Sequence, residues 1–358
     1  QEISEDAALT CFGQEFNPET YAIAKADMLI KGGNASGMKF GATLSDDAFS
    51  GYEFDYIISN PPFGIDWKRE KAQVENEAKR GFDGRFGPGL PAISDGQMLF
   101  MLNGVKKLKE GSGRMAIIQN GSSLFTGDAG SGASEIRRYV IEGDLVEAII
   151  QLPTDLFYNT GISTYIWVLT KGKAMYRSGK VQLIDASKCF VKRRKNIGSK
   201  RVDLDDACID LILRAYEKFS NETYEENGLV VESKVFDNSF FGFTKVTVET
   251  AQADKDGKFI LKKGKKQPVK GASDTEIIPL SEDSEAYMKK NVLPYNPLAY
   301  IDPAKDKIGY EVPFTRLFYK FEAPASSDSI FEEIKALEAE ETILMKELFG
   351  HALSLIHI

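Results

Sequence analysis

Five apolar runs of strand length alternate with helical or glycine-rich segments, and this alternation most constrains how the chain can fold. The runs are FDYIIS (54–59), RMAIIQ (114–119), LVEAIIQL (145–152), STYIWVLT (163–170) and KVQLID (180–185). Strands that are apolar along their whole length are usually buried on both faces by helices in the connections. The pattern therefore predicts an α/β fold with a mostly parallel sheet that is covered on both faces.

The residues before this alternation predict one more strand and a capped helix. ALTCFG (8–13) has the composition of a short buried strand. Asn17 stands where an N-cap belongs, Pro18 takes the first helical position and Gly32 closes the helix. Residues 80–96 are rich in glycine and proline and lack periodicity, so we expect a mobile loop there.

Composition and charge narrow the class of protein. A hydrophobic content of 42% and a charged content of 27% are ordinary for a globular protein, and no apolar run approaches the ~20 residues that span a bilayer. Three scattered cysteines without a C-x-x-C pair indicate a reducing cytoplasm, no disulfide framework and no structural zinc or other metal site. Because the net charge is −8, any nucleic-acid surface must be local.

The first apolar run ends in Asn60-Pro61-Pro62-Phe63, a bend with few hydrogen-bond donors. Two adjacent prolines remove two N–H groups and stiffen the backbone. The groups left to bind a ligand are the Asn60 side-chain oxygen, the Pro61 carbonyl and the Phe63 ring. Ligands of open α/β sheets bind beyond the carboxyl ends of strands, where Asn60 lies. Two acceptors beside a ring suit an exocyclic amino group on a planar heterocycle.

Such an amino group is a poor nucleophile because its lone pair is delocalised into the ring. Hydrogen bonds accepted from both of its N–H bonds favour the pyramidal nitrogen that forms during methyl transfer, which is electrostatic stabilisation. Stacking on Phe63, worth about 1–3 kcal/mol, would hold a base that has left the duplex. Both histidines lie in the last eight residues, and no Pro-Cys pair supports methylation at C5 of cytosine. A plain strand-ending turn is the alternative interpretation of the tetrapeptide.

FDYIISNPPFG resembles the catalytic motif of amino-methyltransferases that use S-adenosylmethionine. The wider pattern resembles the modification (M) subunit of bacterial and archaeal type I restriction-modification systems, which methylates adenine N6 in DNA. The segments that carry the resemblance are FGQEFNPETYAIAKADMLIKG, GRMAIIQNGSSLF, IRRYVIEGDLVEAIIQLPTDLFYNTGISTYIWVLTKG and GYEVPFTRLFY. NPPF also occurs in RNA and protein methyltransferases, so the order of the segments carries the specificity.

The resemblance implies a Rossmann-like class I methyltransferase sheet, S-adenosyl-L-methionine as cofactor and a cytoplasmic location. It implies that Asn60 and Pro61, stiffened by Pro62, bind the target amino group and that Phe63 stacks on the adenine. It also implies that Glu15 accepts hydrogen bonds from the cofactor ribose, and an acid at a strand end before a helix is where nucleotide folds place such an acceptor.

Two departures from the family pattern bear on activity. The family's glycine-rich cofactor loop and N-terminal helical region should precede FGQEF, where this chain has only a dozen residues. Ala42 stands where the family usually offers Asn or Asp to the cofactor adenine. We therefore expect an N-terminally incomplete sheet with negligible cofactor affinity and no activity by itself. An alternative is a permuted order in which LFTGDAGSG (124–132) is the cofactor loop, but QNGSSLF separates it from the preceding strand.

Two later segments, residues 188–201 and 255–270, each hold seven Lys or Arg. In the first, Lys192, Arg193, Arg194 and Lys195 are candidate contacts to DNA phosphates, although a solvated surface explains them equally well. For 255–270 we favour solvated or disordered chain. No segment resembles a base-reading helix, so the resemblance implies that a separate specificity (S) subunit chooses the sequence in double-stranded DNA, beside a restriction (R) subunit.

The segment SSDSIFEEIKALEAEETILMKELF (326–349) predicts a capped helix with a short coiled-coil seam. The seam positions are Ile330, Ile334, Leu337, Glu341, Leu344 and Leu348. It either binds the specificity subunit or packs on its own domain, and Glu341 is unfavourable in a dry interface. We expect a partial catalytic domain at 1–186, an extension at 187–322, the helix at 323–352 and a non-native or frayed tail at 353–358.

The sequence leaves three functions open. The first is adenine-N6 DNA methylation as part of a type I modification subunit. The second is a non-catalytic scaffold in which the fold mainly holds a partner helix. The third is an RNA or protein amino-methyltransferase that shares NPPF.

Overall fold

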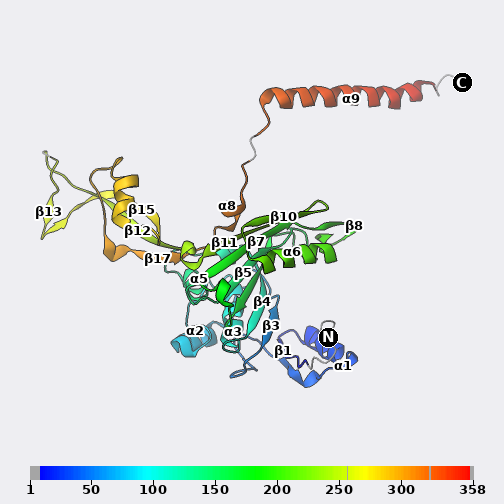
Figure 1. Cartoon of the computed structure of the whole chain (residues 1–358), viewed down its shortest axis with the longest axis horizontal. Coiled ribbons are helices and arrows are strands. Elements are labelled where there is room, and N and C mark those ends of the chain that lie inside the picture. The colour runs from blue at the N-terminus through cyan, green and yellow to red at the C-terminus, as the bar shows by residue number, and fades with distance from the viewer. Residues whose placement is uncertain (1–8, 256, 322–323, 355–358) are drawn as a thin grey trace. The chain divides into compact units, whose positions relative to one another are not determined.

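All five apolar runs form strands of one seven-stranded sheet in the computed structural model, which describes residues 9–255, 257–321 and 324–354 (Figure 1). The sheet order is β10-β11-β7-β5-β6-β4-β3. The strands are β3 (Tyr56–Ser59), β4 (Arg114–Asn120), β5 (Val146–Gln151), β6 (Thr164–Thr170), β7 (Lys180–Lys188), β10 (Glu222–Glu226) and β11 (Leu229–Asp237).

The direction of the strands corrects the expectation of a mostly parallel sheet. β3, β4, β5 and β7 point the same way, but β6 lies antiparallel between β4 and β5, and β11 is antiparallel to β7. The sheet is therefore mixed. β6 is buried in the same manner as its neighbours, with Trp167 and Leu169 at 0% exposure, so its apolar composition carries no sign of its direction.

Helices cover both faces of the sheet at its centre. On one face, α6 (Asp206–Lys218), capped by Asp205, packs its buried side chains against Ile150 and Ile184. The opposite face carries α3 (Gln97–Lys106), α4 (Ser122–Phe125) and α5 (Gly132–Glu142). There the Trp167 indole N–H donates to Ser123 Oγ over 3.2 Å. The core thus lies on both sides of β4, β5, β6 and β7.

The β3 end of the sheet is exposed to solvent. Among the described residues β3 pairs only with β4, so its other edge has no partner strand. Tyr56 is 74% exposed and Ile58 is 90% exposed, although both alternate onto a face that is covered elsewhere in the sheet. The strand that leads into the NPPF bend is therefore an open edge strand.

A small parallel pair of strands precedes β3. β1 (Gly13–Glu15) and β2 (Met38–Phe40) are joined by α1 (Pro18–Ile30) and lie outside the large sheet. The predicted cap is confirmed, because Asn17 Oδ1 accepts from the N–H groups of Glu19 and Thr20. The predicted strand at 8–13 was misplaced: it begins at Gly13 and is half-buried. Ala8 lies outside the described residues.

The glycine- and proline-rich segment 80–96 is folded against the protein, which corrects the expected mobile loop. It follows α2 (Lys71–Ala78) and begins with a 3₁₀ turn at Gly81–Asp83. Phe86 is fully buried, and the buried Trp67 indole donates to Ala92 O over 3.1 Å. Contacts with side chains that are distant in sequence thus order this segment, although its own sequence has no periodic pattern.

A second sheet of four strands follows the first. It consists of β12 (Gly242–Ala251), β15 (Pro268–Pro279), β16 (Ala299–Ile301) and β17 (Lys307–Tyr310). β17 is fastened to α5, because Arg137 Nε donates to Tyr310 O over 2.5 Å and Tyr310 N donates to Ser134 Oγ over 2.9 Å. Two hairpins complete the strands: β8 (Val191–Ile197) with β9 (Lys200–Asp203), and β13 (Leu261–Lys262) with β14 (Lys265–Lys266).

The chain divides into two compact units, residues 1–314 and 315–358. The first also contains α7 (Ser284–Tyr287) and a π-helical turn at Met288–Val292, and α8 (Phe314–Phe318) spans the boundary. The second contains α9 (Ser327–Ser354), whose predicted cap is confirmed, since Ser329 N donates to Ser326 Oγ. None of the helices in the described ranges has the length and apolar composition of a bilayer-spanning segment. Residues 355–358 of the expected tail lie outside the described residues, and the functional boundaries at 186 and 322 stay predictions.

Candidate active site

The NPPF bend follows β3 at the carboxyl end of the strand. Asn60 and Pro62 are exposed, Pro61 is buried and Phe63 is half-buried. Neither the Asn60 side chain nor the Pro61 carbonyl accepts a hydrogen bond from any residue that the structure describes. The buried Pro61 therefore fixes the bend, and the Asn60 and Pro61 oxygens stay available to a ligand beside the Phe63 ring.

The residues after the bend are pinned to the end of the folded segment 80–96. Gly64 has φ +63°, a conformation that glycine adopts without strain, and it turns the chain toward this segment. Gly96 N then donates to Ile65 O over 3.0 Å, and Trp67 N donates to Ile93 O over 3.1 Å. Sequence reasoning missed this anchor, because residues 92–96 carry no periodic pattern.

A polar network at the end of β4 holds the same anchor in place. Asp95 Oδ2 accepts from Gln97 Nε2 and from Ser122 Oγ, each over 2.7 Å. Gln97 Oε1 accepts from Asn120 N over 3.0 Å, and Gln97 is 1% exposed. Because β3 and β4 are parallel neighbours, this network lies at the same edge of the sheet as the NPPF bend. The only sequence signal for it is the cluster of polar residues around the start of α3.

Glu15 lies at the carboxyl end of β1. Its Oε1 accepts from Asn17 N over 2.7 Å, and its backbone carbonyl accepts from Gly41 N over 3.1 Å. The other carboxylate oxygen accepts no hydrogen bond from the described residues. Ala42, which follows Gly41 at the end of β2, has no polar side-chain atom. The strand ends therefore offer one free carboxylate oxygen and no second side-chain acceptor at position 42.

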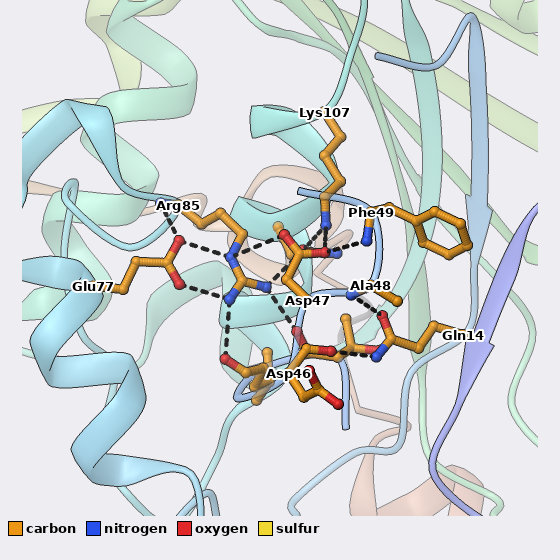
Figure 2. Close-up of polar contacts among 11 residues, drawn as sticks. Gln14, Asp46, Asp47, Ala48, Phe49, Glu77, Arg85 and Lys107 are labelled. Atoms are coloured by element: carbon orange, nitrogen blue, oxygen red, sulfur yellow. Dashed lines mark hydrogen bonds and ion pairs between the residues drawn. The ribbon is translucent and has the colours of Figure 1, made fainter. Parts of the chain in front are cut away.

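Figure 2 shows the polar cluster that fixes the loop after β2. Gln14, the neighbour of Glu15, donates through Nε2 to Asp46 O over 2.5 Å and accepts at Oε1 from Ala48 N over 3.2 Å. Asp47, the next residue of this loop, forms an ion pair of 2.5 Å with Lys107 at the end of α3. The loop thus links β1 to the body of the domain.

Arg85 is the centre of this cluster (Figure 2). It is 7% exposed, its Nη2 lies 2.6 Å from Glu77 Oε2, and its Nη1 donates to Thr43 O over 2.7 Å. Burial raises the pKa of Glu77, but hydrogen bonds and the charge of Arg85 outweigh this and lower it overall. Burial lowers the pKa of Lys107, against the opposing effect of Asp47. No periodic pattern in the sequence indicates the cluster, in which directly bonded residues are up to 60 positions apart.

The predicted DNA contacts lie on the β8–β9 hairpin, which follows the carboxyl end of β7. Lys192, Arg194 and Lys195 are exposed, whereas Arg193 is half-buried and pairs with Asp203. The hairpin is joined to the loop after β5, where Ser199 N donates to Tyr158 O and Arg201 N to Asp155 O, each over 2.8 Å.

The topology brings three of these regions to one edge of the large sheet. β3, β4, β5 and β7 are parallel, so the NPPF bend, the Asp95–Gln97 network and the hairpin-bearing loops all follow carboxyl ends of strands. Glu15 lies apart from them on the separate β1–β2 pair, connected through Gln14.

The glycine-rich loop 124–132 is occupied by contacts within the protein. Gly130 N donates to Ile308 O over 3.1 Å, and Asp128 forms an ion pair of 2.7 Å with Lys245. This use of the loop argues against the permuted order, in which its backbone would face a cofactor.

Comparisons with known proteins show the family and the fold of the chain. Residues 1–256 match the family model described as N-6 DNA Methylase. The methylase subunit of the type I restriction enzyme MjaIX from Methanocaldococcus jannaschii is 28% identical over 192 residues, which cover 53% of this chain and 33% of that protein. The HindI methylase subunit from Haemophilus influenzae is 28% identical over 255 residues, 70% of this chain and 54% of that protein. The chain thus spans about a third to about half of these curated relatives.

Among solved structures, the type I restriction-modification system methyltransferase subunit from Streptococcus thermophilus is 27% identical, with a TM-score of 0.54. The match covers 65% of this chain and 46% of that one. It confirms the predicted α/β fold of the methyltransferase class.

Proposed function

Since the chain belongs to the N-6 DNA methylase family, we propose that it is the catalytic part of a type I modification subunit that transfers a methyl group from S-adenosyl-L-methionine to adenine N6 in DNA. The observation that carries the proposal is the NPPF bend, in which Asn60 and Pro61 present free acceptors at the carboxyl end of a strand.

In this proposal Asn60 Oδ1 and Pro61 O each accept one N–H bond of the target amine. Neither oxygen is basic enough to remove a proton at neutral pH, so their role is to orient the amine and to stabilise the positive charge that develops on its nitrogen. The stiffness of Pro61-Pro62 means that little reorganisation accompanies binding. The half-buried Phe63 ring supplies the stacking surface for a flipped adenine.

The residues present fit the cofactor in part. Glu15 has one carboxylate oxygen free to accept from ribose hydroxyls, and Gln14 and the Arg85 cluster hold this strand end in place. Ala42 supplies no side-chain partner for the adenine ring. When bound, S-adenosyl-L-methionine would supply the electrophilic methyl group. We retain the prediction that this chain alone has negligible affinity for it.

DNA would lie along the edge that carries the β8–β9 hairpin. Lys192, Arg194 and Lys195 are exposed and can neutralise phosphates, whereas Arg193 already pairs with Asp203. These contacts would position the duplex without reading its sequence. Sequence choice is therefore assigned to a specificity subunit, and cleavage to a restriction subunit.

The proposed contact for the specificity subunit is the apolar seam of α9. Its members are 46–69% exposed in the structure: Ile330, Ile334, Leu337, Leu344 and Leu348. The helix surface between Leu337 and Leu348 is a shallow, mostly apolar strip that includes Glu341. An amphipathic partner helix fits the spacing of these apolar residues.

The test is a methyl-transfer assay with duplex DNA, using a polypeptide of the relatives' full length that contains this sequence, in complex with its specificity subunit. Asn60→Ala should lower kcat by about 10²–10³-fold, since it removes one preorganised stabilising group. Phe63→Ala should cost about 1–3 kcal/mol of stacking. Asn76→Ala, on the exposed face of α2, is the matched control and should leave the rate unchanged.

DNA methylation that is unchanged in Asn60→Ala would refute the proposed site. Transfer to RNA or protein in place of DNA would favour the third function, and absence of any methyl transfer would favour a scaffold.

A further inference from the structure

A second basic surface lies beyond the second sheet, between β12 and β15, far in sequence from the β8–β9 hairpin. Residues 252–271 hold seven lysines against two aspartates, in a chain whose net charge is −8. The structure describes this segment, apart from residue 256, as the tip of the long β12–β15 hairpin, whereas solvated or disordered chain was expected for 255–270 (Figure 1).

The tip is a hydrogen-bonded two-stranded ribbon. Gln252 N donates to Gln267 O over 2.7 Å, and Gln267 N donates to Ile260 O over 3.1 Å. β13 and β14 then pair around a two-residue turn at Lys263 (φ +51°) and Gly264 (φ +75°). Positive φ at both turn residues is the geometry that matches the twist of a tight hairpin.

One face of this ribbon concentrates like charges. Lys262 lies directly opposite Lys265 in the register, and Lys263 occupies the turn between them. All three side chains are exposed, and none forms an ion pair with a carboxylate of the described residues. Like charges directly opposite each other destabilise a strand pair, so this arrangement costs folding free energy in the absence of a counter-charge.

The opposite face is held against the second sheet. Lys266 Nζ lies 4.1 Å from the Phe259 ring centroid and 5.1 Å from that of Tyr300 in β16. The ribbon is therefore anchored by one lysine, and Lys262, Lys263 and Lys265 are left on the solvent side.

We propose that the ribbon of residues 252–271 is a second DNA-binding element, which contacts backbone phosphates outside the catalytic edge. A two-stranded ribbon has the width that the major groove of B-DNA admits, and exposed lysines are point charges suited to phosphates. A polyanion also removes the repulsion between Lys262 and Lys265. The choice of DNA as the polyanion rests on the proposed function. The ribbon extends that function because it would bind the duplex independently of base sequence.

The test compares two double variants of the chain that each remove two positive charges. K262S/K265S removes the cross-strand pair, and K289S/K290S removes two exposed lysines of the π-helical turn in the same unit. Binding of a fluorescent 30-base-pair duplex is measured by anisotropy over a series of NaCl concentrations, without methyl donor. K262S/K265S should lower the slope of log K against log[NaCl] by about 2 and weaken binding roughly fifty-fold at 0.1 M NaCl.

Removing the like-charge pair should leave the thermal unfolding midpoint unchanged or raised, which separates lost contacts from lost folding. The proposal is overturned if the parent chain does not bind the duplex, if K262S/K265S keeps the parent slope, or if K289S/K290S weakens binding equally. Retained DNA affinity with loss of binding to poly-glutamate would assign the ribbon to an acidic protein surface instead. Since no methyl donor is present, failure of methyl transfer does not affect this result.

Discussion

Replacing Arg85 by methionine is the sharpest test of how the β1–β2 pair is attached to the rest of the domain. Arg85 is 7% exposed, donates to Glu77 and to the carbonyl oxygens of Thr43 and Leu44, and lies 3.8 Å from Asp47. Methionine preserves much of the apolar stem but removes every donor. The Glu77 carboxylate, whose side chain is 18% exposed, then loses the guanidinium group that lies 2.6 Å from it.

The expected loss follows from this geometry. Removing one partner of a buried ion pair costs about 3–5 kcal/mol, because the other charge is left desolvated. At roughly 2 °C for each kcal/mol in a unit of this size, the unfolding midpoint should fall by roughly 6–10 °C. Arg80→Met, on the exposed side of the same segment, is the matched control and should cost less than about 1 kcal/mol.

A double-mutant cycle with Glu77→Gln isolates the pair. Trp67, which is 3% exposed and packs beside this segment, provides the fluorescence signal for thermal and urea unfolding. The double variant should be more stable than the sum of the single losses by at least about 1.5 kcal/mol, since neither unpaired charge remains. Strict additivity, or a loss below about 1 kcal/mol in Arg85→Met, would refute the assigned role.

The Arg85–Glu77 pair also predicts how the free energy of unfolding depends on pH. The pKa of Glu77 is lower in the folded protein than its ordinary value of 4.5, so the folded state binds fewer protons on this group than the unfolded state near that value. Its stabilisation is therefore complete above about pH 4.5 and is lost as pH falls through the lower folded pKa. Glu77→Gln should remove this part of the acid sensitivity.

Two further predictions concern other buried groups. Glu147 is 1% exposed and lies 2.5 Å from Arg114 Nη2 and 3.4 Å from Arg177 Nε. Glu147→Gln should therefore lower the free energy of unfolding in urea by about 3–5 kcal/mol. A loss below about 1 kcal/mol would contradict its role between two guanidinium groups. Burial raises the pKa of the Cys189 thiol to about 12, whereas Cys11 is exposed. Iodoacetamide at pH 8 should therefore alkylate Cys11 of the folded chain and leave Cys189 unmodified until urea is added. Mass spectrometry of the folded sample checks this, and early labelling of Cys189 would be the contrary result.

Local rules predicted much of the fold. The caps at Asn17 and Ser326 and the five apolar strands follow from neighbouring residues, so they could be identified without tertiary information. The reversed direction of β6 could not, because a strand covered on both faces is apolar whichever way it points. The strand expected at 8–13 was misplaced because its apolar side chains serve an aromatic cluster, in which the Phe12 ring lies 5.7 Å from that of Phe49.

For the candidate site, the acceptors could be predicted but their support could not. Asn60, Phe63 and Glu15 stand at strand ends that the sequence pattern identifies. Arg85 is a single polar residue in a segment without periodicity, and Gln97 is the first residue of α3. Their partners are distant in sequence. Only the folded chain brings those partners together, so no pattern of spacing indicates them.

The open edge of β3 has a consequence for the protein in solution. On its outer side the backbone N–H and C=O groups are unpaired among the described residues, and Tyr56 and Ile58 stand bare beside them. Such an edge is a template for any extended segment, including the same edge of another molecule. In a concentrated preparation of this chain by itself, monomers would associate by pairing of these edge strands. A peptide that pairs with the β3 edge would prevent this association.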